Sequence, residues 1–488
     1  MARHADKAII VNLSALRAKY GAAGLASIRA ALARMADADR ARGLSTRLVA
    51  VDRTVTMDSV HGPTVRDPSD APTVKAAVDA AAAAVTAHYL LLLGAPDVLP
   101  QQQLRNPTGD EDPSVPSDLP YACALPASDD AGDFVGPTRV VGRLPDLVGS
   151  TDPAYVVALL DAAAGWTPRA RTAHAKVFTL STDSWKVSTR LTLQGLGGDP
   201  ASVHLSPVEG PAFTAALLRS RTHLVNCHGG DTDPRWYGER RGTATLPVAL
   251  EPASLAGRLS TGTVVAAECC YGAQHYPPSL AGGTASLALT YLQQGAAGVV
   301  GSSTLSYGPV DDMGSADLLC RYLLTAVLDG ASLGRALLVA RQRFAQEHGE
   351  LDPVDLKTLA QFDLLGDPSI TPVRLPVPRS APAGLRATSA GAGLRRQVLA
   401  QVGAGLARAV ARTTPDPVRR ADPRRVEALA RAAGVAPPRA GDVRSYRTSA
   451  AVPSRTTFHL LESADRRRLT VLRDEPGAPP TARTVVRK

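Results

Sequence analysis

The sequence lacks the features that mark membrane, secreted or zinc-stapled proteins. Its apolar runs, such as 89–93, are strand-sized and far short of the ~20 residues that a membrane-spanning helix needs. The first residues contain no extended apolar segment and no small-residue cleavage site, so we do not expect a secretory signal. The five cysteines are odd in number and lack C-x-x-C spacing, which argues against a disulfide framework or a structural zinc site. We therefore expect a cytoplasmic protein with free thiols, no metal and no cofactor.

Charge is distributed unevenly along the chain. Residues 374–488 contain 23 Lys and Arg against 8 Asp and Glu, net +15, whereas residues 1–373 are net −6. The change falls at a Pro-rich stretch, 372–387, which is typical of a linker. Such a split usually separates an appended interaction module from a differently charged body. At 488 residues, 44% of them hydrophobic, the chain is long and apolar enough for two to four folded units.

Short apolar runs alternate with helical patterns along residues 1–373. Continuous apolar strands of this length are typical of a parallel sheet that is buried on both faces. We expect an α/β body with two doubly wound, mostly parallel halves, followed by a linker and a small basic α+β module. The corresponding boundaries are 1–150, 151–373, 374–393 and 394–488. The strands are expected at 8–11, 46–51, 89–94, 138–145, 176–180, 202–206, 222–227, 263–268 and 297–303, and three helical segments then run to Leu365.

Two of the expected strands end in residues that can carry out acyl transfer. The run 222–227 is followed by His228 and Gly229, and the run 263–268 is followed by Cys269 and Cys270. Catalytic groups of such sheets lie beyond the carboxyl ends of the strands, and strands that follow each other in sequence are usually neighbours. A thiol beside an imidazole can attack a carbonyl carbon, and a glycine after the His lets backbone N–H groups approach the resulting oxyanion.

The simpler interpretation is packing, because a single Cys or His at a strand end is usually structural. The nucleophile is also not unique, since Cys227 lies beside His228 and Cys269 beside Cys270. Side chains alternate along a strand, so only one of Cys269 and Cys270 can face His228.

The order of these blocks resembles the caspase–gingipain superfamily. A strand with His-Gly and, about 40 residues later, a strand with small-Cys-x-Gly is that superfamily's pattern, and ECCYG (268–272) is similar to the caspase form. CHAT-domain proteases share these two blocks. Four further segments are similar to the gingipain-type branch, in the order that family shows: LLLLGAPDVLP (90–100), SDLPYA (117–122), VVGRLP (140–145) and FDLLGDPSITP (362–372). The resemblance covers about residues 85–373 and implies a caspase-like, three-layer α/β/α fold.

The resemblance also implies a role for each matching residue. His228 is the expected base and Cys270 the nucleophile, and the backbone N–H groups of Gly229 and Cys270 form the oxyanion hole. Asp118 matches the acid that lines the specificity pocket for Arg, where a carboxylate pairs with a guanidinium. Tyr307 lies where the family carries an aromatic lid over that pocket.

Whether a third residue orients His228 is left open by the sequence. The acidic loop residues Asp110, Glu111 and Asp112 are candidates, although such clusters are normally solvated.

The basic module offers fewer signals. Helical patterns occupy 394–410 and 423–434, and 456–474 is typical of a hairpin. Its positive charge would suit nucleic acid, but Tyr446 and Phe458 are its only aromatic residues, too few for stacking on single strands. We expect a protein-interaction module that contacts a regulatory or recruiting protein, with nucleic acid unfavoured and no membrane contact.

The resulting hypothesis is an intracellular cysteine endopeptidase that cleaves proteins or peptides after Arg or Lys, with a role in bacterial immunity or programmed cell death. The alternative is a catalytically weak scaffold with a basic tail. Because the tail and the body have opposite net charge, we further expect the tail to dock on the body. Our hypothesis is that the docked tail restrains activity until a partner displaces it or a cut within 374–396 releases it. The alternative is that the tail recruits substrate and leaves the catalytic rate unchanged.

Overall fold

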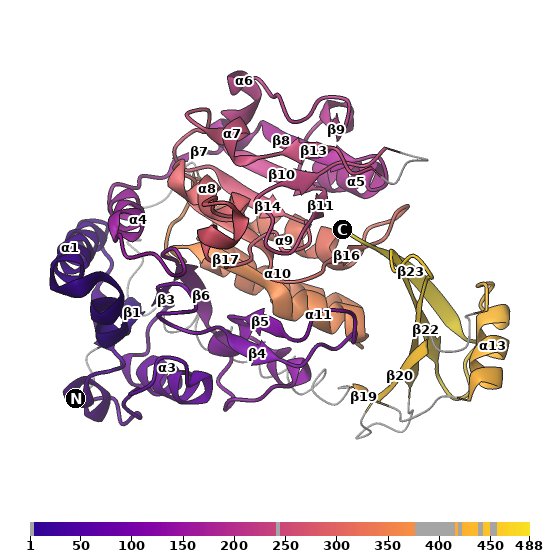
Figure 1. Cartoon of the computed structure of the whole chain (residues 1–488), viewed down its shortest axis with the longest axis horizontal. Helices are drawn as coiled ribbons and strands as arrows, with labels where there is room; N and C mark the ends of the chain where they lie inside the picture. Colours follow the sequence, from indigo (N-terminus) through magenta and orange to yellow (C-terminus); the bar gives the residue numbers. More distant parts are fainter. Residues whose placement is uncertain (1–3, 241–244, 376–414, 418–421, 438–442, 449–455) are drawn as a thin grey trace, which may run out of the picture.

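A single ten-stranded sheet runs through the body of the protein (Figure 1). The computed structural model describes residues 4–240, 245–375, 415–417, 422–437, 443–448 and 456–488. In order across the sheet, the strands are β2 (Thr46–Ala50), β1 (Lys7–Val11), β3 (Tyr89–Leu93), β6 (Val140–Leu144), β17 (Phe362–Gly366), β15 (Gly298–Ser302), β14 (Val264–Ala267), β10 (Thr222–Asn226), β8 (Val177–Thr182) and β9 (His204–Ser206). The expected mixed α/β fold with a mostly parallel sheet is confirmed.

Strand β17 joins the two halves of this sheet. It pairs antiparallel with β15, Phe362 opposite Ser302, and parallel with β6, Leu365 opposite Arg143. All other neighbours in the sheet are parallel, so the strands of the two halves run in opposite directions. The expectation of a helical run to Leu365 is wrong at its end. A five-residue apolar run that follows a helix without a break cannot be told from more helix by periodicity.

Helices cover the sheet on both faces, as a three-layer arrangement requires. Along β1, Ile9 and Val11 belong to the hydrophobic cluster under α1, whereas Ala8 and Ile10 belong to the cluster under α3. The helices of the body are α1 (Leu13–Ala41), α2 (Thr54–Asp58), α3 (Ala71–Val85), α4 (Ala154–Ala164), α5 (Lys186–Gly195), α6 (Ala215–Leu218), α7 (Pro252–Leu255), α8 (Leu287–Gln293), α9 (Ser315–Leu328), α10 (Leu333–His348) and α11 (Pro353–Gln361). No helix in the described part of the chain has the length and apolar character needed to cross a bilayer.

Several very short strands pair outside the main sheet. Two of them, β4 and β5, form a hairpin, and β11 to β13 form a small antiparallel sheet directly after β10. These strands are β4 (Gln102–Leu104), β5 (Val115–Ser117), β7 (Arg169–Ala170), β11 (His228–Gly229), β12 (Trp236–Tyr237), β13 (Val248–Leu250) and β18 (Val373–Arg374).

The basic tail forms a separate antiparallel sheet that connects to the body. Helix α13 (Pro423–Ala432) packs on this sheet through Val426 and Ala430. The tail strands are β19 (Pro415–Pro417), β20 (Val443–Thr448), β21 (Thr457–Glu462), β22 (Arg468–Asp474) and β23 (Thr481–Arg487). In Figure 1 the yellow strand β23 runs to the body and ends beside β16 (Tyr307–Gly308), with which it pairs.

The expected helix at 423–434 and the expected hairpin at 456–474 are confirmed as α13 and β21–β22. The expected helix at 394–410 and nearly all of the expected linker lie outside the described residues.

Candidate active site

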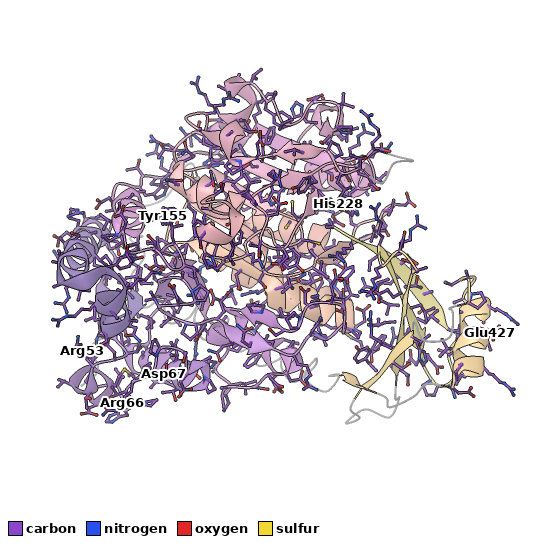
Figure 2. All side chains as sticks on the ribbon, in the orientation of Figure 1. Arg53, Arg66, Asp67, Tyr155, His228 and Glu427 are labelled. Atoms are coloured by element: carbon purple, nitrogen blue, oxygen red, sulfur yellow. The ribbon has the colours of Figure 1, made fainter. Side chains whose placement is uncertain are left out.

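The ends of β10 and β14 lie side by side, as expected for consecutive strands. The two strands are parallel neighbours, with Val225 opposite Ala267. Immediately beyond them, Gly229 lies against Cys270: a Cβ on Gly229 would stand 1.8 Å from the Cys270 carbonyl oxygen. Only a residue without a side chain permits this approach. The structure therefore brings together the two segments that carry His228 and Cys270, and Figure 2 labels His228 on the part of the body that faces the tail.

The neighbouring thiols face different surroundings. Cys227 and Cys269 are buried in the main hydrophobic cluster of the body, whereas Cys270 belongs to a cluster with Leu305 and Tyr307. The Cys270 Sγ accepts a hydrogen bond from the Ser306 N–H at 3.2 Å and lies 3.4 Å from the Ser306 carbonyl oxygen.

Burial raises the pKa of the Cys270 thiol to about 11, although the Ser306 N–H acts in the opposite direction. Burial also raises the pKa of Cys227 and of Cys269 well above the usual range for a thiol. Assignment of Cys270 as nucleophile stays a prediction, and the Cys270 side chain is 1% exposed in this structure.

The His228 ring lies between an indole and a carboxylate. Its centroid is 4.7 Å from the Trp185 ring, at an interplanar angle of 65°. Its Nε2 is 3.9 Å from Glu239 Oε2, and the Ser184 hydroxyl donates to the same oxygen. The contact with His228 and the hydrogen bond from Ser184 lower the pKa of Glu239 to about 2, although burial acts in the opposite direction. Glu239 is thus an ionised group beside the imidazole, and nothing in the local sequence marks it.

The acidic cluster considered for that role has different partners. Lys357 of α11 donates to Asp110 and to Asp112, in both cases at 2.6 Å. The same two carboxylates accept the hydroxyls of Tyr307, at 2.7 Å, and of Tyr271, at 2.8 Å. These acids are paired rather than solvated, and they hold two tyrosines of the Cys270 cluster.

Tyr271 adopts a backbone conformation that is unusual for a residue with a side chain. Its φ is +54°, directly after Cys270, and its N–H donates to Thr304 at 2.9 Å. Backbone strain of this kind clusters at functional sites and persists only where surrounding contacts maintain it. Here the hydrogen bond from the Tyr271 hydroxyl to Asp112 is such a contact. Tyr307, the expected lid, is 4% exposed and packs in the same cluster, so its role over a pocket stays a prediction.

Asp118 is buried and paired in this structure, so its role in a specificity pocket stays a prediction. Arg143 donates to both of its carboxylate oxygens, Nε at 2.8 Å and Nη2 at 2.6 Å. Arg143 is fully buried and Asp118 is 4% exposed. The segments SDLPYA and VVGRLP therefore supply the two halves of one internal ion pair, which leaves no free carboxylate for a substrate.

A different acidic pocket lies at the ends of β10 and β14, and a lysine ammonium fills it. The Nζ of Lys488 donates to Asn226 Oδ1 at 2.8 Å, to Glu268 Oε2 at 3.0 Å and to Asp317 Oδ1 at 2.5 Å. It also lies 5.5 Å from the centre of the Trp185 ring. All of these side chains are buried. We call Asn226, Glu268, Asp317 and Trp185 the acidic pocket.

The backbone of Lys488 connects this pocket to Cys270. Its N–H donates to the Ser306 carbonyl oxygen at 2.9 Å, the same oxygen that the Cys270 thiol contacts. A Cβ on Gly308 would stand 2.2 Å from Lys488 Cε, so Gly308 leaves the space through which the lysine stem passes.

Sequence reasoning missed this pocket, although Glu268, an acid at the end of the apolar run TVVAAE and two residues before Cys270, was a visible signal.

No group of three potential metal ligands lies at His228 or Cys270 in the described residues. The one such group among the described residues is His4, Asp6 and His88, in the N-terminal half, and the Asp6 carboxylate there already accepts hydrogen bonds from the Ser45 N–H and hydroxyl.

Comparison with known proteins bears on the second half of the body. The family model of peptidase family C25 matches residues 250–373. The matched segment contains Cys270, Tyr307 and two residues of the acidic pocket, Glu268 and Asp317, and begins after His228. A search of curated proteins finds no match. Residues 250–373 are thus similar to peptidase family C25, the gingipain family of cysteine peptidases.

Proposed function

We propose that the protein is an endopeptidase that cleaves polypeptides after Lys or Arg, with Cys270 as nucleophile and His228 as acid–base. His228 takes the Sγ proton of Cys270, and the thiolate attacks the carbonyl carbon of the scissile bond. The N–H groups of Gly229 and Cys270 donate to the oxyanion that forms. His228 then protonates the leaving amine, which departs and leaves a thioester on Cys270. Attack by water, assisted by His228, releases the acid and restores the thiol.

The observation that carries this proposal is the ammonium held in the acidic pocket, next to Cys270. Two carboxylates buried together are unfavourable unless a cation pairs with them. Burial raises the pKa of Glu268 well above its usual range, with Lys488 acting against that shift and Asp317 adding to it. A basic side chain is therefore the group that this pocket binds best, and Glu268 and Asp317 take the role that the sequence suggested for Asp118.

Glu239 supports the same chemistry as a positioning residue. An ionised carboxylate 3.9 Å from His228 Nε2 favours the imidazolium that forms when Cys270 loses its proton. The intracellular setting and a role in immunity or cell death rest on the sequence features alone.

A scaffold with little activity is the second candidate. It is favoured by the 1% exposure of Cys270 and by its raised pKa, since a buried, protonated thiol is a poor nucleophile.

A positional library of peptides, varied at the residue before the scissile bond, separates the two. We expect the wild type or Lys488→Ala to cut after Lys and Arg, and Cys270→Ala and His228→Ala to lower the rate by about 10³-fold or more. Cleavage that ignores the varied residue, or that persists in Cys270→Ala, would contradict the proposal. Absence of cleavage by every variant would favour the scaffold.

A further inference from the structure

The strand that carries Lys488 lies where a protease substrate would lie. Strand β23 adds antiparallel to β16, with Arg487 opposite Tyr307 and Val486 opposite Gly308. Extended peptides commonly bind proteins by adding a strand to an exposed sheet edge. The register places the Lys488 N–H on the Ser306 carbonyl oxygen, directly beside the Cys270 thiol.

The side chain of Lys488 completes this arrangement. Its three ammonium protons have three acceptors, Asn226, Glu268 and Asp317, which matches the donor capacity of a lysine. Burial alone would lower the pKa of Lys488, but its ion pairs with Asp317 and Glu268 raise it, so the ammonium stays charged.

The tail sheet also covers Cys270. Cys270 and Leu305 of the body form one buried cluster with residues from three tail strands: Phe458, Leu460, Leu469, Val471 and Val485. Tail side chains therefore occupy the space through which a substrate peptide would reach the Cys270 thiol.

Ion pairs hold the tail to the body around strand β23. Arg483 binds Asp352, at 2.5 Å, and Asp355, at 2.8 Å, and Arg473 binds Glu350 at 2.7 Å. Arg487 pairs with Glu111. The basic tail and the acidic body thus meet through opposite charges, as the charge distribution of the sequence suggested.

We infer that residues 481–488 act as a built-in occupant of the substrate groove, with Lys488 in the primary specificity pocket, and that the protein gains activity when this strand leaves. The inference rests on the proposed function for the meaning of the groove. It assigns Asn226, Glu268 and Asp317 as the residues that select the basic side chain of a substrate.

The test compares full-length variants in two assays. Lys488→Ala removes the ammonium, and Arg487→Ala weakens the strand outside the pocket. Arg431→Ala is the control, because it removes an equal charge from α13. Arg431 pairs with Glu427, which Figure 2 labels at the outer end of the tail. The first assay is the rate at which iodoacetamide modifies Cys270, mapped by mass spectrometry. The second is kcat/KM on a short peptide with Lys before the scissile bond.

We expect Lys488→Ala and Arg487→Ala to increase both rates about tenfold or more, because access is proportional to the open fraction, and Arg431→Ala to match the wild type. A synthetic peptide TARTVVRK, the sequence of 481–488, should protect Cys270 of Lys488→Ala from iodoacetamide, whereas TARTVVRA should not.

The outcomes separate the two proposals. Faster modification and peptide protection without cleavage by any variant would support the groove occupant and contradict the peptidase. Cleavage by the wild type at the rate of Lys488→Ala, with equal modification rates and no protection by TARTVVRK, would overturn the groove occupant and leave the peptidase. If Lys488→Ala does not fold, Arg487→Ala decides by the same rates.

Discussion

At the scale of single residues, the candidate site depends on close backbone approach as much as on side chains. The contact between Gly229 and the Cys270 carbonyl sets the distance between the loops that carry His228 and Cys270. Sequence reasoning located both residues because each follows an apolar strand with a visible end. It did not locate Glu239 or Asp317, because their partners come from distant segments that only the fold brings together.

Replacement of Gly229 by alanine tests that approach. The new Cβ would stand 1.8 Å from a backbone oxygen, so one loop has to move. We expect kcat/KM to fall about 100-fold, as for other misplacements near 1 Å. Gly230→Ala is the matched control, since its Cβ would meet only the Asp233 side chain at 3.2 Å. Equal activity of the two variants would show that the approach is unimportant.

The protonation of Cys270 gives a pH prediction. Burial raises its thiol pKa to about 11, so the reactive thiolate is scarce at pH 8 and increases as the pH rises towards 11. Release of β23 exposes the thiol, so the modification rate of Lys488→Ala should rise at lower pH than that of the wild type. The measurement is the mapped iodoacetamide rate between pH 7 and pH 11. Superimposable profiles would contradict the burial by the tail.

Asp118 should act on stability rather than on specificity. Its bidentate pair with Arg143 is buried, and removal of one partner of such a pair costs about 3–5 kcal/mol. Asp129→Asn is the control, because that carboxylate is exposed and 3.6 Å from Arg105, a contact expected to contribute at most about 1 kcal/mol. Urea unfolding of both variants measures the difference. A loss as small as that of Asp129→Asn would show that the pair is unimportant.

At the scale of elements, the order of strands and helices was largely predictable and the joining of the halves was not. The continuous apolar strands β1, β3 and β14 stand out in the sequence because both of their faces are buried. Strand β17 does not stand out, since it follows α11 without a turn signal. Its antiparallel pairing with β15 reverses the direction of one half, which a pattern of alternating strands and helices does not reveal.

Helix α11 should support the site through Lys357, which holds the loop that contains Asp110 and Asp112. Burial would raise the pKa of Asp110, but the ion pair and hydrogen bonds from Lys357, Tyr307 and Thr108 hold it at about 2. Because this pKa lies below its usual value, the stabilisation is present above about pH 4 and is lost as the pH falls towards 2.

Lys357→Met removes the cation of that cluster. We expect a lower free energy of unfolding at pH 7, by about 3–5 kcal/mol, and a smaller further loss between pH 4 and pH 2 than in the wild type. Urea unfolding across this pH range checks both parts. An acid-induced loss as steep as that of the wild type would show that Lys357 does not set the ionisation of Asp110.

At the scale of the whole molecule, the uneven charge of the sequence corresponds to a contact in the structure. The net-positive tail meets the net-negative body, and Arg483, Arg473 and Arg487 make ion pairs across the boundary. The sequence indicated that the tail docks. It did not indicate where, because the position depends on one strand, β23, adding to β16 and on one ammonium entering the acidic pocket.

We propose that Glu268 and Asp317, rather than Asp118, select a basic residue before the scissile bond. The most direct measurement is the ratio of kcat/KM for Lys over Leu peptides, in Lys488→Ala and in the same variant with Asp317→Asn or Asp118→Asn added. The ratio is independent of how much protein is folded. We expect Asp317→Asn to lower this ratio about 30-fold or more, as for loss of one partner of a buried charge pair, and Asp118→Asn to leave it unchanged. A ratio that is unchanged in Asp317→Asn and falls in Asp118→Asn would show that Asp118, and not Asp317, selects the basic residue.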